Sequence, residues 1–117
     1  MFRLSNLIKS TLQEQKSRSL DGSIIIWNMT NRCNLLCHHC YSKASANEKE
    51  SLSLEDILKT IPKLKIANIN FVIFSGGEPL LRKAIFEIAQ SMKDNKIMTY
   101  LSTNGTYITQ KNAQKII

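Results

Sequence analysis

The stretch INFVIFSGGEP, residues 69–79, predicts a buried strand that ends in a glycine turn. Most of its first six residues are apolar, which is typical of a strand covered on both faces in a parallel sheet. Gly76 and Gly77 allow a ligand to approach the backbone closely, and Pro79 fixes the entry into the next helix. Glu78 offers a carboxylate to a cationic amine. The alternative is an ordinary glycine turn, with a glutamate that is favoured by the dipole of the following helix.

Two further strands are predicted, one before and one after this stretch. Residues 23–27, SIIIW, are apolar at nearly every position and suit a strand covered on both faces. Residues 96–101 predict a third strand, which ends at the polar sequence STNGT. Each of the three strands is followed by a polar or glycine-rich loop. In parallel α/β folds the ligand site lies at the carboxyl ends of the strands, so we expect all three loops to face one site.

Helices are predicted between the strands. Ser53 and Asp56 form a capping box at the start of the first, and Pro62 is expected to kink or shorten that helix. The predicted helices cover residues 53–64, 85–92 and 109–117. Strands that alternate with helices of this length indicate βαβ units around a parallel sheet. We therefore interpret the chain as α/β, the front half of a larger barrel.

The first residues carry a different pattern. Apolar residues at helical spacing predict an amphipathic leader helix within 1–20, ahead of a domain over 21–117. The chain has no apolar run of about 20 residues, the length that spans a bilayer, and no continuous apolar segment typical of a signal peptide. An odd number of cysteines argues against a secreted disulfide framework. The sequence therefore predicts a cytoplasmic protein without a membrane partner.

The formal net charge is +7, from 16 Lys and Arg against 9 Asp and Glu in 117 residues. Such a balance suits an anionic partner, such as an acidic protein or a carboxylate-bearing ligand. Most lysines are scattered among acidic residues, as on solvated helix faces, and no basic block alternates with aromatics. This pattern excludes nucleic-acid binding from the predicted functions.

All three cysteines lie within eight residues, at Cys33, Cys37 and Cys40. Three closely spaced thiolates can each ligate one iron of a cubane cluster, which leaves one iron open to a small molecule. Zinc is the rival, because it takes four ligands and His38 or His39 could supply the fourth. The spacing favours the cluster, since both histidines lie inside the cysteine segment and no second pair of ligands follows. Both metals stay open on this pattern alone.

Taken together, the two motifs resemble those of the radical S-adenosylmethionine (SAM) superfamily. There a Cys-x3-Cys-x2-Cys segment follows the first strand and a Gly-Gly-Glu-Pro turn follows the second, as residues 33–40 and 76–79 do here. The resemblance covers residues 23–117. It implies a partial TIM-type barrel of six βα units, of which this chain, as an N-terminal fragment, carries the first three.

The resemblance also implies a cofactor set. Cys33, Cys37 and Cys40 would ligate a [4Fe-4S] cluster, and the amino and carboxylate groups of SAM would bind its open iron. The reduced cluster would cleave SAM to methionine and a 5′-deoxyadenosyl radical, which takes a hydrogen atom from a substrate. The residues implied to contact SAM are Gly76, Gly77 and Glu78 at the methionine amine, His39 near the adenine, and Ser102, Thr103 and Asn104. For the last three residues, a plain turn at Asn104-Gly105 without a role in SAM binding is the alternative.

Residues 24–42, IIIWNMTNRCNLLCHHCYS, are most similar to the tetrapyrrole-modifying members, above all those of haem d1 biosynthesis. This implies a tetrapyrrole substrate and an acidic electron donor such as a flavodoxin or ferredoxin. Those members carry a C-terminal extension with further cysteines, which these 117 residues do not include, so the substrate and any second cluster stay open. Enzymes that mature peptides or cofactors are the nearest alternative. A small zinc- or cluster-binding interaction module is the alternative of another class.

Overall fold

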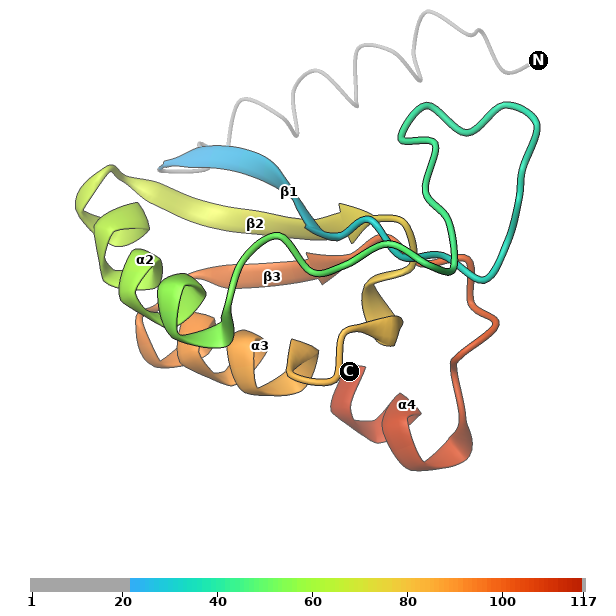
Figure 1. Ribbon diagram of the computed structural model, residues 1–117. Coiled ribbons are helices and arrows are strands. Elements are labelled where there is room, and N and C mark those ends of the chain that lie inside the picture. Colours follow the sequence, from blue (N-terminus) through green and yellow to red (C-terminus); the bar gives the residue numbers. More distant parts are fainter. Residues whose placement is uncertain (1–21, 117) are drawn as a thin grey trace, which may run out of the picture.

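The computed structural model describes residues 22–116, which form a three-stranded parallel sheet with helices on one face (Figure 1). The strands are β1 (Ser23–Thr30), β2 (Ile69–Gly76) and β3 (Met98–Leu101), in the order β1-β2-β3. Both neighbouring pairs run parallel. The predicted α/β class is therefore confirmed, while the predicted leader helix over residues 1–20 lies outside the described residues. β3 begins two residues later than predicted, because Lys96 has a positive φ of 57° and belongs to the preceding turn.

The helices follow the strands in the predicted order. They are α2 (Leu54–Ile66), a short 3-10 helix (Pro79–Leu81), α3 (Ile85–Asp94) and α4 (Gln110–Ile116). The capping box is confirmed, since the Ser53 hydroxyl accepts the N–H of Asp56 at 3.1 Å.

The expectation that Pro62 shortens the first helix is wrong. α2 continues to Ile66, four residues beyond the proline. Ile57 and Ile61 before it are buried, and Leu64 after it packs against the core, so tertiary contacts hold both sides of the proline in the helix. Pro62 itself is exposed, where its ring meets few neighbours.

The core lies between the sheet and the two helices α2 and α3, which cover the same face in Figure 1. Burial of these apolar side chains is the main source of stability. The fully buried apolar members of this core are Val72, Ile61, Ile88 and Met92, with Ile57 at 1% exposure.

The opposite face of the sheet is open among the described residues. Ile24 and Ile26 of β1 are 52% and 67% exposed, and Met98 and Tyr100 of β3 are 56% and 50% exposed. The register aligns Ile26 with Ile73 of β2, and Ile73 with Tyr100, so these side chains share one face. The prediction that the first strand is covered on both faces is wrong here, because α2 and α3 both pack on the other side. Within residues 22–116 no helix combines the length and the apolar character needed to cross a bilayer.

Candidate functional site

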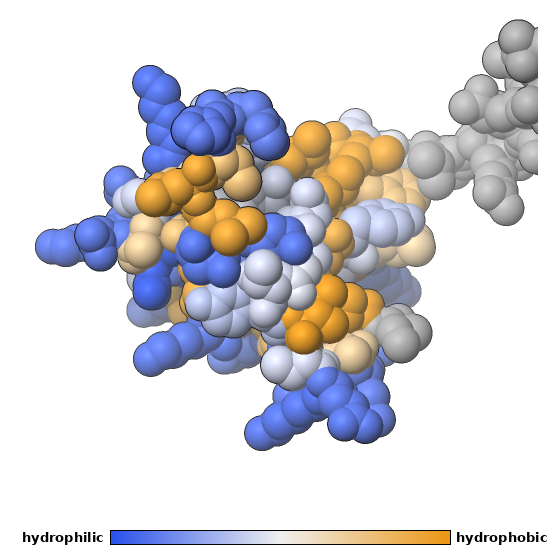
Figure 2. Space-filling model, turned by 90° about the vertical axis from the view of Figure 1, so that its right-hand side faces the viewer, coloured by the Kyte–Doolittle hydropathy of each residue, from blue (hydrophilic) through white to orange (hydrophobic). Residues whose placement is uncertain are grey.

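Three loops meet at the carboxyl ends of the strands, on the right of Figure 1. They are the cysteine loop (31–45), the GGEP turn (76–79) and the β3 loop (102–106). Figure 2 views this end of the molecule, where apolar patches lie among strongly polar ones. The parallel topology brings these loops together, as the sequence predicted.

The GGEP turn is joined to the base of the cysteine loop by its backbone. The N–H of Gly77 donates to the carbonyl of Thr30, and the N–H of Glu78 donates to the carbonyl of Arg32, both at 2.8 Å. A Cβ on Gly76 would lie 2.3 Å from the Thr30 oxygen, and one on Gly77 would lie 2.1 Å from the Arg32 oxygen. The glycines are therefore required by the close contact of two backbone segments. The sequence also suggested that the two glycines let a ligand approach the backbone, and this stays a prediction.

Glu78 is the centre of a second junction, between the GGEP turn and the β3 loop. Its side chain is fully buried. Oε1 accepts the N–H of Leu80 at 2.9 Å and the Thr103 hydroxyl at 2.8 Å, and Oε2 accepts the N–H of Asn104 at 2.8 Å. The Thr103 hydroxyl also lies 2.9 Å from Oε2, so one hydroxyl serves both oxygens. A carboxylate offers about four acceptor positions, and these four contacts occupy them.

The charge of Glu78 is not paired by the protein in the part that the structure describes. The two ion pairs found there join Lys59 to Glu55 and Arg82 to Glu50. Burying a carboxylate without a cation is costly unless hydrogen bonds compensate it. The hydrogen bonds from Leu80, Thr103 and Asn104 therefore provide this compensation.

The cysteine loop is anchored at its base and exposed at its tip. The N–H of Cys33 donates to the carbonyl of Ser45 at 3.1 Å, and the N–H of Ser45 donates to the carbonyl of Asn31 at 3.2 Å. Cys33 and Cys40 are half-buried and Cys37 is exposed, and all three thiols are free of disulfide bonds. No three His, Cys, Asp or Glu side chains within residues 22–116 are grouped to hold a metal ion. In this structure the three thiols are therefore not gathered around one point.

The chemistry of the thiols suits metal thiolates. The hydroxyl of Ser42, 3.3 Å from the Cys40 sulfur, and the main-chain N–H groups of residues 42–44 lower the pKa of Cys40. A lowered pKa favours the thiolate, which is the metal-binding form. The sulfur of Cys33 accepts the N–H of Leu35 at 3.4 Å and lies 3.9 Å from Nδ2 of Asn104.

The structure brings some of the predicted site residues together and leaves others apart. Thr103 and Asn104 meet Glu78, and Asn104 also contacts the cysteine loop through Asn34, at 3.1 Å. Ser102 and His39 are exposed. His38 is exposed as well, and neither histidine completes a metal site among the described residues.

One groove of about 1020 Å³ lies away from these loops. It runs between α3, the edge of β3 and the end of α4, and its lining includes Phe86, Met98 and Lys115. None of the predicted cluster or SAM residues lines it. This groove is therefore not the candidate site.

Comparison with known proteins decides the family. The family model described as the radical SAM superfamily matches residues 27–117, which is most of the chain. The chain belongs to the radical SAM superfamily. Radical SAM proteins use a [4Fe-4S] cluster and SAM, which agrees with the resemblance of the two motifs.

Several curated radical SAM relatives are similar to this chain. The Fe-coproporphyrin III synthase of Methanosarcina barkeri is 40% identical over 94 residues, which are 80% of this chain and 24% of the relative. The pre-heme d1 synthase of Dinoroseobacter shibae is 33% identical over 99% of this chain and 30% of its own length. The mycofactocin maturase MftC of Mycolicibacterium smegmatis is 33% identical over 90% of this chain and 27% of its own. The chain therefore spans less than a third of each of these relatives.

A solved structure confirms the fold. BtrN, crystallised with AdoMet and 2-DOIA, superposes with a TM-score of 0.66 over 81% of this chain and 41% of BtrN, at 23% identity. At this identity the likeness concerns the fold alone. The three parallel strands with their helices are thus part of a radical SAM fold, as the sequence predicted.

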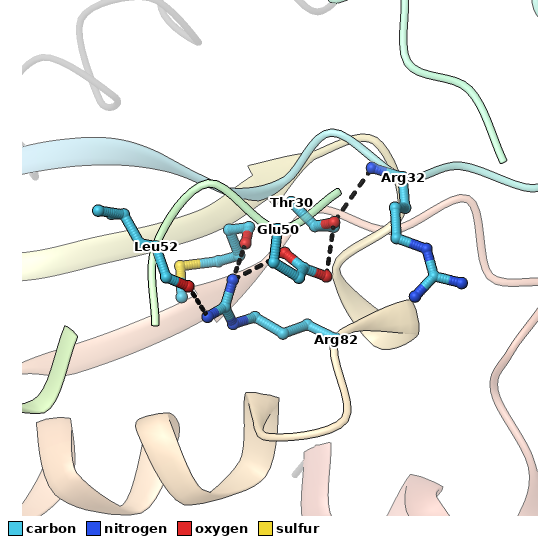
Figure 3. A network of polar contacts seen from close by, with 6 residues as sticks. Thr30, Arg32, Glu50, Leu52 and Arg82 are labelled. Atoms are coloured by element: carbon cyan, nitrogen blue, oxygen red, sulfur yellow. Dashed lines mark hydrogen bonds and ion pairs between the residues drawn. The ribbon is translucent and has the colours of Figure 1, made fainter. Parts of the chain in front are cut away.

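Four residues around the site were missed by the sequence analysis. Thr30, Glu50, Leu52 and Arg82 form a polar network beside the base of the cysteine loop (Figure 3). No local signal indicated it, because Arg82 is followed directly by Lys83 and nothing in the sequence marks one of the two as buried.

Proposed function

We propose that this chain forms part of a radical SAM enzyme in which Cys33, Cys37 and Cys40 ligate a [4Fe-4S] cluster and SAM binds beside the GGEP turn. The junction of the three loops carries the proposal. It joins the cysteine loop, the GGEP turn and the β3 loop through hydrogen bonds at one end of the sheet. When bound, the cluster and SAM together supply a 5′-deoxyadenosyl radical, the reagent of this family.

Glu78 would act on SAM mainly through its charge. Because its side chain is fully buried, the methionine amine would bind at the rim formed by Gly76 and Gly77, with the carboxylate behind it. No lysine or arginine pairs with this carboxylate in the described part of the chain, so its field favours a cation at the turn. The same carboxylate holds Thr103 and Asn104, and would thereby fix the β3 loop beside SAM.

The cysteine loop would close when it takes up the cluster. Its base is already fixed by the bonds of Cys33 and Ser45, whereas Cys37 at the tip is exposed. His39, one residue before Cys40, would then be carried toward the adenine of SAM. Ser102 is exposed at the end of β3 and would face SAM from the other side.

For the substrate we propose a tetrapyrrole, as in haem d1 or related haem biosynthesis. The support is that relatives named Fe-coproporphyrin III synthase, pre-heme d1 synthase and AdoMet-dependent heme synthase are 31–40% identical to the chain. Maturation of a peptide or cofactor is the second candidate, supported by relatives named mycofactocin maturase at 32–33% identity. An assay of the full-length protein with a tetrapyrrole and with a peptide precursor separates the two by which substrate promotes 5′-deoxyadenosine formation.

Anaerobic reconstitution with iron and sulfide tests the cluster assignment. We expect about four irons per chain, because three thiolates in this spacing suit a cubane with one open iron. Serine at Cys33, Cys37 or Cys40 should each abolish the uptake, while the His38→Ala variant should keep it. If the chain instead bound one zinc ion tightly and showed no iron-sulfur absorption, the result would support the alternative of a small zinc-binding interaction module.

A further inference from the structure

The side chain of Arg82 is buried at the junction between the GGEP turn and the cysteine loop (Figure 3). Only 6% of the residue is exposed. Its Nη1 donates to the carbonyl of Met29 at 2.7 Å and to Oε2 of Glu50 at 2.8 Å, and its Nη2 donates to the carbonyl of Leu52 at 2.8 Å. One guanidinium thus connects the end of β1 with the segment that returns from the cysteine loop.

Glu50 extends this network to the base of the cysteine loop. Its Oε1 accepts the hydroxyl of Thr30 at 3.1 Å, and the same hydroxyl oxygen accepts the N–H of Arg32 at 3.0 Å. Arg32 in turn holds the GGEP turn, since its carbonyl accepts the N–H of Glu78. The ion pair of Arg82 and Glu50 therefore braces both chain segments that enter and leave the cysteine loop.

Stability alone does not explain a charged residue at this place. The Arg82 side chain, 7% exposed against 31% for Glu50, loses most of its hydration, and apolar residues of similar size often replace a buried charge of this kind without loss of stability. Nε of Arg82 has no hydrogen-bond partner among the described residues, which adds to the cost of burial. The guanidinium instead provides hydrogen bonds in fixed directions. It binds two carbonyls and one carboxylate from three different chain positions, in the fork geometry that only arginine offers.

We propose that Arg82 and Glu50 are positioning residues for cluster uptake, which set the cysteine loop in register with the GGEP turn. This inference rests on the cluster-binding function proposed above. The backbone of Arg82 is fixed to the turn by its N–H, which donates to the carbonyl of Pro79 at 3.0 Å. The Arg82 side chain therefore fixes residues 29–33 and 50–52 relative to the GGEP turn. The cysteines that would ligate the cluster and the SAM site at the GGEP turn are then held at a fixed distance from each other.

Hydrogen exchange and iron content together test the proposal on this chain. Glu50→Gln and Arg82→Met break the ion pair, and Arg82→Lys keeps its charge but not the fork. Glu55→Gln is the matched control, because it breaks the exposed pair with Lys59. The amides of Cys33 and Ser45 report the base of the loop, and the amide of Ile88, which bonds the Ala84 carbonyl, reports the core.

We expect exchange at Cys33 and Ser45 to become about tenfold faster in Glu50→Gln and Arg82→Met, with Ile88 unchanged. Iron uptake should fall by about half or more in both, and Arg82→Lys should lie between them and the unmodified chain. Glu55→Gln should change neither. If the Arg82→Met variant does not fold, the Glu50→Gln variant alone tests the proposal.

Two results would overturn the inference while leaving the proposed function in place. Unchanged iron uptake in Glu50→Gln would show that the ion pair does not position the loop. Faster exchange at Ile88 to the same extent as at Cys33 would assign the pair to general stability. No iron in the unmodified chain would overturn the proposed function, and the inference with it, so the two failures are distinguishable.

Discussion

Replacing Glu78 by alanine should destabilise the chain strongly, because the carboxylate is the acceptor for two loops at once. The substitution removes the acceptor of the Leu80 and Asn104 N–H groups and of the Thr103 hydroxyl. A hydrogen bond to a charged group contributes about 1.5–3 kcal/mol, but Asn104 is exposed and Thr103 is half-buried, so water can replace part of the loss. The two main-chain bonds at the lower limit give a decrease of about 3 kcal/mol in the free energy of unfolding.

Urea unfolding, followed by far-ultraviolet circular dichroism, measures this decrease. For a domain whose total stability is about 5–15 kcal/mol, a loss of this size shifts the midpoint clearly. Thr103→Val, which removes one donor and leaves the carboxylate in place, should cost about 1 kcal/mol. Glu87→Ala on the exposed side of α3 is the matched control and should cost little. If Glu78→Ala shifted the midpoint no more than Glu87→Ala, the role of Glu78 as the link between the GGEP turn and the β3 loop would be refuted.

Two other predictions concern α2 and the cysteine loop. Pro62→Ala should raise the free energy of unfolding by about 2 kcal/mol, since it restores a helical N–H at an exposed position; no gain in urea unfolding would contradict this. Ser42→Ala should raise the pKa of Cys40, because the hydroxyl is the main cause of its lowered value. In a chain with serine at Cys33 and Cys37, the pH profile of iodoacetamide alkylation should therefore move to higher pH, and an unmoved profile would exclude the hydroxyl as the cause.

The fold could be predicted from the sequence because its signals are local and repeated. The apolar run at residues 69–74 and the cap at Ser53 depend on neighbours only a few positions away. The two expectations that failed depend on distant contacts. Pro62 stays inside α2 because the core holds residues on both sides of it, and β1 is open on one face because both flanking helices lie on the other.

The site could be predicted in part. The motif pattern at residues 33–40 and 76–79 indicated the family, and the family model confirms it. The contacts within the site could not be predicted, because they join residues far apart in the chain. Glu78 meets Thr103 across 25 positions, and Arg82 meets Glu50 across 32. No local pattern fixes such pairs.

The electron paramagnetic resonance spectrum of the reduced, reconstituted chain, recorded with and without SAM, tests the central claim most directly. If the three loops form one site, SAM binds next to the cluster, and its addition should shift the spectrum. The shift should require higher SAM concentrations in Glu78→Ala, and serine at any of the three cysteines should remove the signal. A cluster signal that SAM leaves unchanged would contradict the account, because it would separate the cysteine loop from the GGEP turn in function.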